Sequence, residues 1–409
     1  MSLIESSKVV RWVLWFVVFC GSAYLALRRY ELFEHVVPRG TTGPGNDFWQ
    51  FLHASRLIDA GKSPYDVSTL THNSGYVYTP LIALAFLPFA HADTVHIWHV
   101  FTALSIAAVI VFASLVSFVE VPILPRWLRP LLFGFTIFTA LQFMPTTVEF
   151  NSGQVDTFVL VMLAFAVLAT VRGRAATTGV LIGLGALIKT WPAGVGLTLL
   201  GRGYASRQRA LVGFIVVLLV GPVLAIGVGG ISGLWDFLKV TVDSRTQHLI
   251  SLSVWGVPKL LFSASKLARP LFVSTPIEFL AMLIFFAWVV GLLVLVVHYG
   301  ESSSLSFWNV TACVVLLLPV SHLNYTMYFL PLLWIWAARW LVAPRIDDRL
   351  FAVMILIGLW WLVTFNWPVD DSATASSLHV SVIFFGNLAA VTISVIGDRL
   401  QKVPLKRSV

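Results

Sequence analysis

Apolar runs of about 20 residues recur along this chain, and they restrict its possible folds more than any other feature. A bilayer core of about 30 Å needs roughly 20 apolar residues per helix. Only 11% of the 409 residues are charged, against roughly 25% in an ordinary soluble domain. The sequence therefore predicts an all-α, polytopic membrane protein without a soluble domain that could fold alone. The clearest runs are 9–27, 95–118, 155–171, 207–228, 276–299, 350–366 and 379–397.

Shorter or interrupted runs raise the expected count to about 11–13 transmembrane helices, in a single membrane-embedded domain over residues 1–409. Segment 305–342 is long enough for two spans, with a break expected around Pro319 to Tyr325. Segment 178–200 is apolar except for Lys189, and Pro192 predicts a break in its helix. The two short runs are 79–91 and 129–144.

The basic residues predict how the chain is oriented. Although the net charge is +8, these residues are not massed in one segment, as a nucleic-acid footprint would require. They form short clusters between apolar runs, and the positive-inside rule places such clusters in the cytoplasm. The two long loops, 28–78 and 229–275, are then extracytoplasmic. The same count does not place the short basic loops 119–128 and 172–176 inside, so one or two short runs are expected to be re-entrant. The basic clusters used here are 201–209, 339–349 and the C-terminal tail.

The first long loop is expected to contain an amphipathic helix on the membrane surface. Asn46 suits the N-cap, Asp47 suits the first turn, and Gly61 is a natural stop. Asp47 is either an ordinary helix-start carboxylate or a general base that takes a proton from a hydroxyl. Asp59 and Asp66 are weaker candidates for the same role.

Polar residues inside or beside the apolar runs are further candidates. An ionisable residue within a span is energetically expensive and indicates function by default. Lys189 is therefore expected to hold a lipid phosphate, the alternative being a lysine that snorkels to the interface. Gln154 and Asp156 begin a span and either cap it or belong to a site. His322 lies at a break between runs, and Arg245 is predicted to contact a sugar or a lipid phosphate from the second loop.

Three stretches, taken together and in order, are similar to motifs of one enzyme family. Their order and spacing resemble glycosyltransferase family 87 over roughly residues 40–330. Members are membrane-embedded GT-C type enzymes that use polyprenyl-phosphate sugars, and the best-known ones are mannosyltransferases that elongate phosphatidylinositol mannosides. The first stretch is Asn46-Asp47-Phe48 with 60–66 and 76–81, the second is 151–156 (Asn-Ser-Gly-Gln-Val-Asp), and the third is 183–192 (Gly-Leu-Gly-Ala-Leu-Ile-Lys-Thr-Trp-Pro).

The resemblance implies a role for several residues. Asp47 would be the catalytic base, Gln154 with Asn151 would lie near the reacting sugar, and Lys189 would lie near the donor phosphate. Tyr78, in the first stretch, is a further predicted sugar or acceptor contact. The family often has a late Ser-Trp-x-His-His type sequence. Here residues 321–325 read Ser-His-Leu-Asn-Tyr, so Asn324 and Tyr325 replace the double histidine. With His322 they are predicted to contact the sugar or the acceptor, and the departure leaves the identity of donor and acceptor open.

These observations predict a glycosyltransferase of the cell envelope, in the plasma (bacterial inner) membrane, with its active site on the extracytoplasmic face. It would move a monosaccharide, mannose by resemblance, from a polyprenyl-phosphate donor to a hydroxyl of a glycolipid or lipid-linked glycan. Membrane lipids are the other expected partners. No nucleic acid, cofactor or metal is expected, since no cluster of metal ligands is visible in the sequence. The alternatives are a transporter or flippase of an anionic isoprenoid lipid and a non-catalytic membrane scaffold.

Overall fold

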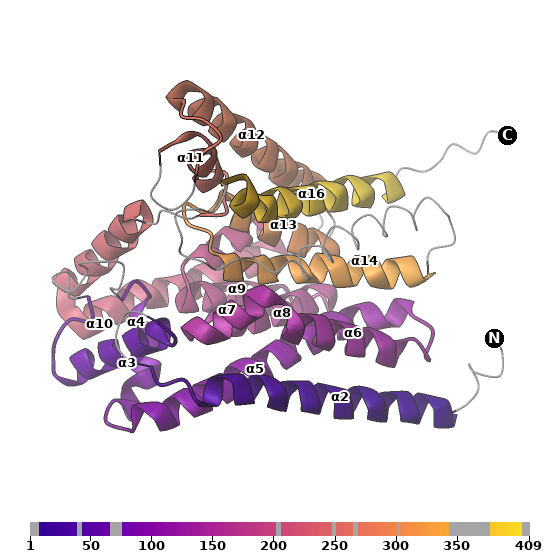
Figure 1. Cartoon of the computed structure of the whole chain (residues 1–409), viewed down its shortest axis with the longest axis horizontal. Helices are drawn as coiled ribbons and strands as arrows, with labels where there is room; N and C mark the ends of the chain where they lie inside the picture. Colours follow the sequence, from indigo (N-terminus) through magenta and orange to yellow (C-terminus); the bar gives the residue numbers. More distant parts are fainter. Residues whose placement is uncertain are drawn as a thin grey trace.

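The protein is all-helical along the parts of the chain that the computed structural model describes, and its helices pack side by side (Figure 1). The described parts are residues 8–38, 43–65, 76–201, 206–247, 251–264, 269–300, 303–342 and 377–402. No β-strand occurs in these ranges. The predicted class, an all-α polytopic membrane protein, is confirmed.

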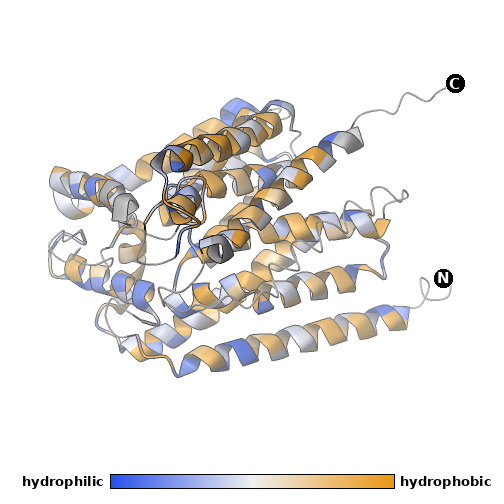
Figure 2. Ribbon diagram, turned by 45° about the horizontal axis from the view of Figure 1, so that its top comes forward, coloured by the Kyte–Doolittle hydropathy of each residue, from blue (hydrophilic) through white to orange (hydrophobic). Residues whose placement is uncertain are grey.

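Five of the described helices are long and apolar enough to cross a bilayer, and a pair bent by 55° would make a sixth span. The most apolar stretches of three of them are only 0%, 11% and 17% buried by protein, so lipid must cover the rest. Apolar residues dominate the middle of the long helices, and polar residues gather toward their ends (Figure 2). The long helices are α2 (Lys8–Glu34), α5 (Thr94–Glu120), α10 (Arg207–Gln247), α12 (Thr275–Tyr299) and α16 (Ser377–Lys402), and the bent pair is α6 (Arg129–Gln142) with α7 (Met144–Ser152).

Shorter apolar helices form the centre of the bundle. α8 packs against α5 and α9, and α13 packs against α12 and η4. Because protein rather than lipid surrounds them, these helices can be shorter than the roughly 20 residues of a lone span. The predicted span 350–366 lies outside the described residues, so the total of 11–13 stays a prediction. The shorter helices are α8 (Asp156–Val171), α9 (Ala175–Ile188), η4 (Trp191–Leu200), α13 (Ser304–Leu317), η5 (Leu323–Phe329) and α14 (Leu330–Val342).

Both predicted helix breaks are present, one of them displaced. The chain leaves α9 after Ile188, and Lys189 has an extended backbone with φ −145° and ψ 130°. The break thus precedes Pro192, which occupies the second position of η4. A proline is tolerated there because the first N–H groups of a helix have no intrahelical partner. The second break, at 318–322 between α13 and η5, falls within the predicted region.

The short run 79–91 does not span. It forms α4 (Pro80–Phe86) and η2 (Leu87–Phe89), which are seven and three residues long. Together they reach roughly 15 Å, half of a bilayer core, and they pack on α3 (Asn46–Asp59). Removing this run from the count of spans puts the basic loops 119–128 and 172–176 on the side of the N-terminus. Loop 201–209 lies on that same side because α9 and α10 run in the same direction, with Gly179 against Ala210 and Gly183 against Val217, so the chain doubles back at η4. The expectation of a re-entrant run therefore fits this segment.

Both segments that the sequence predicts as long loops contain helices. α3 is preceded by Gly45 as N-cap, with φ 72°, so the prediction of Asn46 as the cap is wrong by one residue. In the second loop, α10 continues past a kink at Gly230 to Gln247, and α11 (Gly256–Phe262) follows. Helix resumes after the kink because Phe237 and Val240, three residues apart on one helical face, are buried against the core.

Glycines bring α9 and α10 into close contact. A Cβ atom on Gly179 would lie 1.9 Å from the carbonyl oxygen of Ala210, and one on Gly183 would lie 2.8 Å from Cβ of Val217. Small residues at such positions let two membrane helices approach backbone to backbone, where dispersion forces can hold them. The α9–α10 contact therefore depends on the absence of a side chain at Gly179.

We predict that Gly179→Ala destabilises the protein by roughly 1–3 kcal/mol, because the added methyl group forces two backbones apart. The measurement is the thermal midpoint of detergent-purified protein, followed by size-exclusion chromatography of heated samples. The matched control is Gly227→Ala on α10, where a Cβ would meet no atom within 4 Å. Equal midpoints for the two variants would contradict the close contact.

Candidate active site

The first turn of α3 is docked on the turn between α7 and α8. The Gly45 N–H donates a hydrogen bond to the Asn151 carbonyl at 2.6 Å. Gly153 has φ +70°, and a Cβ atom there would lie 2.6 Å from Cβ of the fully buried Phe48. Only glycine satisfies both the left-handed backbone and the close approach. This turn therefore fixes where Asp47, the neighbour of Phe48, stands.

Asp47 and Gln154 are in direct contact across this junction. The Gln154 side-chain Nε2 donates to Oδ2 of Asp47 at 2.7 Å, between residues 107 apart in the chain. On its other side, Gln154 Oε1 accepts from the Tyr78 hydroxyl at 2.8 Å and from Lys189 Nζ at 3.0 Å. The structure thus brings together four of the residues that the sequence singled out.

Lys189 joins this junction to the buried centre of the bundle. Its Nζ lies 2.6 Å from Oδ2 of Asp156, the first residue of α8. The same ammonium lies 4.6 Å from the ring centroid of Tyr325 and 5.7 Å from that of Tyr78. Ring faces attract cations at such distances. The ammonium is therefore surrounded by a carboxylate, an amide oxygen and two aromatic rings of the protein itself.

A second acid lies beneath the ion pair. Asn324 Nδ2 donates to Oε2 of Glu149 at 2.7 Å and to Oδ2 of Asp156 at 3.0 Å. The Tyr328 hydroxyl donates to Oδ1 of Asp156 at 2.8 Å. Asp156 and Glu149 are both fully buried, at 0% exposure. Buried charges need this degree of hydrogen bonding, so α7, α8, α9 and η5 are tied together by polar contacts.

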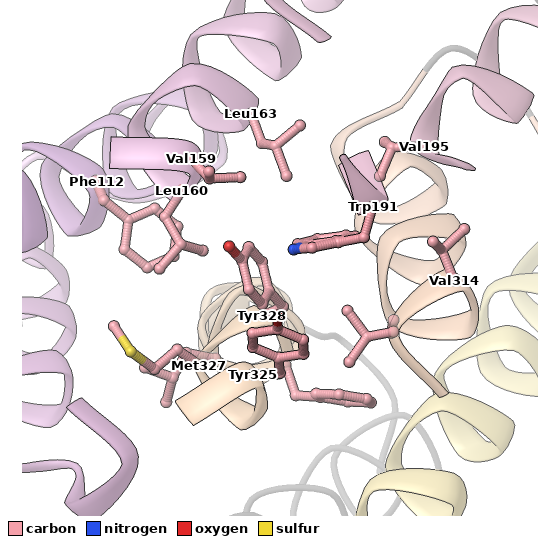
Figure 3. Close-up of a cluster of buried hydrophobic side chains, with 14 of the residues drawn as sticks. Phe112, Val159, Leu160, Leu163, Trp191, Val195, Val314, Tyr325, Met327 and Tyr328 are labelled. Atoms are coloured by element: carbon pink, nitrogen blue, oxygen red, sulfur yellow. The ribbon is translucent and has the colours of Figure 1, made fainter. Parts of the chain in front are cut away.

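Aromatic rings close the network on its inner side. The Trp191 ring packs against Tyr328 at 4.6 Å between centroids and an interplanar angle of 81°. Tyr325 lies 6.0 Å from Trp191 and 5.8 Å from the His322 ring. Figure 3 shows Trp191, Tyr325 and Tyr328 meeting among aliphatic side chains of α8 and α13. The inner side of the polar network thus packs against aromatic and aliphatic side chains.

Asp47 is the accessible end of the network. It is partly exposed, and so is Gln154, whereas the acids behind them are fully buried. Burial raises the pKa of Asp47 to about 6, the negative charge of Asp156 also raises it, and Lys189 and the Gln154 hydrogen bond lower it. A carboxylate with such a pKa is ionised near neutral pH and accepts a proton more readily than an ordinary aspartate.

The remaining candidates lie elsewhere or contribute less. Asn151 is exposed and takes part through its backbone carbonyl. His322 is the N-cap residue of η5 beside Tyr325. Arg245 lies near the end of α10, and its side chain is outside the described residues. Asp59 pairs with His91 at 2.8 Å at the far end of α3, and Asp66 is outside the described residues. The ranges that the structure covers contain no group of three or more metal-binding side chains.

Three members of the network were not among the predicted site residues: Glu149, Asp156 and Tyr328. Glu149 carries a detectable signal, because it is an acid between Val148 and Phe150 in an apolar stretch. For Asp156 the sequence allows either helix capping or a place in the site, and its ion pair with Lys189 favours the second. Tyr328 gives no such signal, since a tyrosine among aromatic residues is ordinary in a membrane helix.

One protein-family model, glycosyltransferase family 87, matches residues 76–321. This range covers more than half of the chain. The chain belongs to glycosyltransferase family 87. It is therefore a membrane glycosyltransferase, and the predicted family is confirmed. No curated protein matches the chain.

The residues matched by the family 87 model include most of the polar network but not Asp47, its accessible end. Tyr78, Gln154, Asp156 and Lys189 lie within residues 76–321, whereas Asp47 precedes them. His322, Asn324 and Tyr325 follow directly after the matched range. Family membership thus gives the class of reaction.

Proposed function

We propose that this family 87 glycosyltransferase moves a monosaccharide from a polyprenyl-phosphate donor to a hydroxyl of a glycolipid or lipid-linked glycan, with Asp47 as general base. The observation that supports this proposal most strongly is the Asp47–Gln154 contact, in which a partly exposed carboxylate is held at the edge of a buried polar network. A positioned carboxylate with a pKa near 6 suits removal of a hydroxyl proton. The choice of mannose as the sugar rests on the resemblance.

The proposed step is a single displacement. Asp47 takes the proton of the acceptor hydroxyl as its oxygen attacks the anomeric carbon, and the bond from that carbon to the donor phosphate oxygen breaks. The products are the glycosylated acceptor and a free polyprenyl phosphate. Among the described residues only Oδ2 of Asp47 is hydrogen-bonded, which leaves Oδ1 for the acceptor. The sequence predicts Arg245 and Lys189 as the residues that hold the donor phosphate.

A lipid-linked donor fits the construction of the molecule. The long helices present apolar surfaces that protein does not cover, and an isoprenoid chain is soluble only next to such surfaces. The polar network lies where α3, α7 and α8 meet, and Asp47 and Gln154 at its edge are partly exposed. The competing transporter and scaffold hypotheses are set aside because the chain belongs to a family of glycosyltransferases.

We predict that Asp47→Asn lowers the rate of sugar transfer by about a hundredfold to ten-thousandfold, because the amide cannot take the proton. Donor binding should stay unchanged. The assay is transfer of radiolabelled mannose from polyprenyl-phosphate mannose to a membrane glycolipid extract by purified protein. Asp59→Asn, at the other end of α3, is the control and should retain activity. Transfer by Asp47→Asn within threefold of the unmodified protein would remove Asp47 as the base.

The pH dependence gives a second test of the same residue. The base acts only when ionised, so kcat/KM should fall below about pH 6 and approach a tenfold loss per pH unit. At pH values above the pKa of Asp47, kcat/KM should no longer change with the protonation of this residue. The measurement is kcat/KM from pH 4.5 to 8 in detergent. A profile that stays flat down to pH 4.5 would show that no carboxyl group with a raised pKa limits the rate.

We also propose that the site faces away from the cytoplasm. The first residues of α2 and the last of α16 lie at one end of the molecule, and α3 and α4 lie at the other (Figure 1). Lys8 and Arg11 begin α2, and Arg399 lies near the end of α16. Basic residues at membrane helix ends favour the cytoplasmic side.

This orientation predicts which positions react with an impermeant maleimide in intact cells. Cysteine at Lys62, just after α3, should be labelled through the outer face, whereas cysteine at Gln208, near the start of α10, should be labelled only after lysis. The background should replace the native Cys20 and Cys313 with alanine, since Cys20 is exposed. The reverse labelling pattern would place the active site in the cytoplasm and remove the case for an extracytoplasmic donor.

A further inference from the structure

The Gln154 amide has only one orientation that satisfies its neighbours. An amide oxygen is an acceptor, and an amide NH₂ group is a donor. Lys189 carries an ammonium, which can only donate, and it faces one side of the Gln154 amide at 3.0 Å. The Tyr78 hydroxyl donates to the same oxygen at 2.8 Å. The NH₂ group must therefore point to the opposite side, where the Asp47 carboxylate accepts its hydrogen bond.

The ammonium of Lys189 is itself fixed on the protein side. It is 2.6 Å from Asp156, whose other oxygen accepts from Tyr328. The ring of Tyr325 lies over it at 4.6 Å, and Lys189 is only 9% exposed. A lysine with its charge already paired and its surroundings filled is poorly placed to bind a phosphate from outside.

We infer that Gln154 is a positioning residue for the Asp47 base, oriented by Lys189 and Tyr78, and that Lys189 acts on the reaction through Gln154 rather than by binding the donor phosphate. The inference rests on the proposed function of Asp47. It assigns the Lys189–Asp156 ion pair a role in positioning the base, and it replaces the sequence-based prediction for Lys189.

The groups that face Asp47 determine what removal of Gln154 would do. Lys189 at the end of α9 and the Gln154 hydrogen bond favour the ionised carboxylate, and Asp156 on α8 disfavours it. The Tyr78 hydroxyl, before α4, faces the same space. Removing the amide donor therefore raises the pKa of Asp47 and moves the acid limb of the rate profile to higher pH. A residue with a merely structural role would lower protein stability without moving that limb.

The test is Gln154→Met, which keeps the length of the side chain and removes both the donor and the acceptor. Hydrogen bonds to charged groups are strong, so kcat should fall by roughly tenfold to a hundredfold. The dissociation constant of polyprenyl-phosphate mannose, measured by titration into purified protein, should stay within twofold. The acid limb should move up in pH. Ser152→Ala, in the same turn, is the control, because its hydroxyl bonds only locally to the Val148 carbonyl among the described residues.

The role of Lys189 needs a variant that does not leave Asp156 as an unpaired buried charge, since such a charge can prevent folding. Asp156→Asn combined with Lys189→Met removes both members of the pair. It should lower kcat and leave donor affinity within twofold. Added to Gln154→Met, it should cause little further loss, because groups that act in series are not additive.

Three outcomes would overturn the inference. One is a tenfold weaker donor affinity in the paired variant with normal turnover of bound donor, which would return Lys189 to the phosphate. A second is a Gln154→Met variant with unchanged kcat and unchanged acid limb while Asp47→Asn is inactive, which would leave the base without this support. The third is an Asp47→Asn variant that keeps its activity. In that case Asp47 is not the base, and the proposed function is contradicted together with the inference that rests on it. If the paired variant does not fold, the kcat and pH profile of Gln154→Met still decide.

Discussion

The buried ion pair between Lys189 and Asp156 is the contact on which the rest of the site depends. Removing two charges from water is expensive, and their mutual attraction offsets that expense only with further hydrogen bonds and good geometry. Asp156 receives hydrogen bonds from Tyr328 and Asn324, and Lys189 donates one to Gln154. Tyr328 and Asn324 come from η5 and Gln154 from the turn before α8, so satisfying one ion pair brings η5, the start of α8 and the end of α9 together.

The backbone around the pair is arranged for the same purpose. Lys189 stands in the break between α9 and η4, and Asn324 lies in η5 just after the break that follows α13. Breaks inside a membrane protein leave backbone groups without helical partners, and these are tolerated only where protein or water surrounds them. Both breaks open toward the polar network, while uninterrupted helices such as α2 and α12 face lipid. The irregular backbone is thus confined to the place where polar side chains converge.

Much of this organisation could be predicted from the sequence. The apolar runs located the long helices, and the rarity of a lysine in an apolar segment singled out Lys189. Gln154 and Asp47 were found by motif, and the structure places them in contact. What could not be predicted was the partner of Lys189, because Asp156 is 33 residues away and the pairing depends on how α8 packs against α9. Without that packing, a lone lysine in a span resembles a ligand site.

The errors have equally local causes. The run 79–91 has the composition of a span, but its two helices reach only about half of a bilayer core and pack on α3. Pro192 suggested a break at its own position, yet a proline fits the first turn of the following helix without loss. Glu149 could not be recognised from the sequence because its hydrogen-bond donor, Asn324 in η5, is 175 residues away.

The network, in its described members, holds three carboxylates and one cation, and this imbalance has a consequence for catalysis. If Asp47, Asp156 and Glu149 are all ionised, Lys189 neutralises one of them and an excess of negative charge remains in a poorly solvated place. Such an excess increases the proton affinity of the most accessible acid. On the proposed mechanism, Asp47 becomes neutral in the same step in which the departing lipid phosphate gains charge. The cluster then repels the developing anion less than it did before the reaction, so proton uptake by the protein and bond cleavage in the donor favour one another through space.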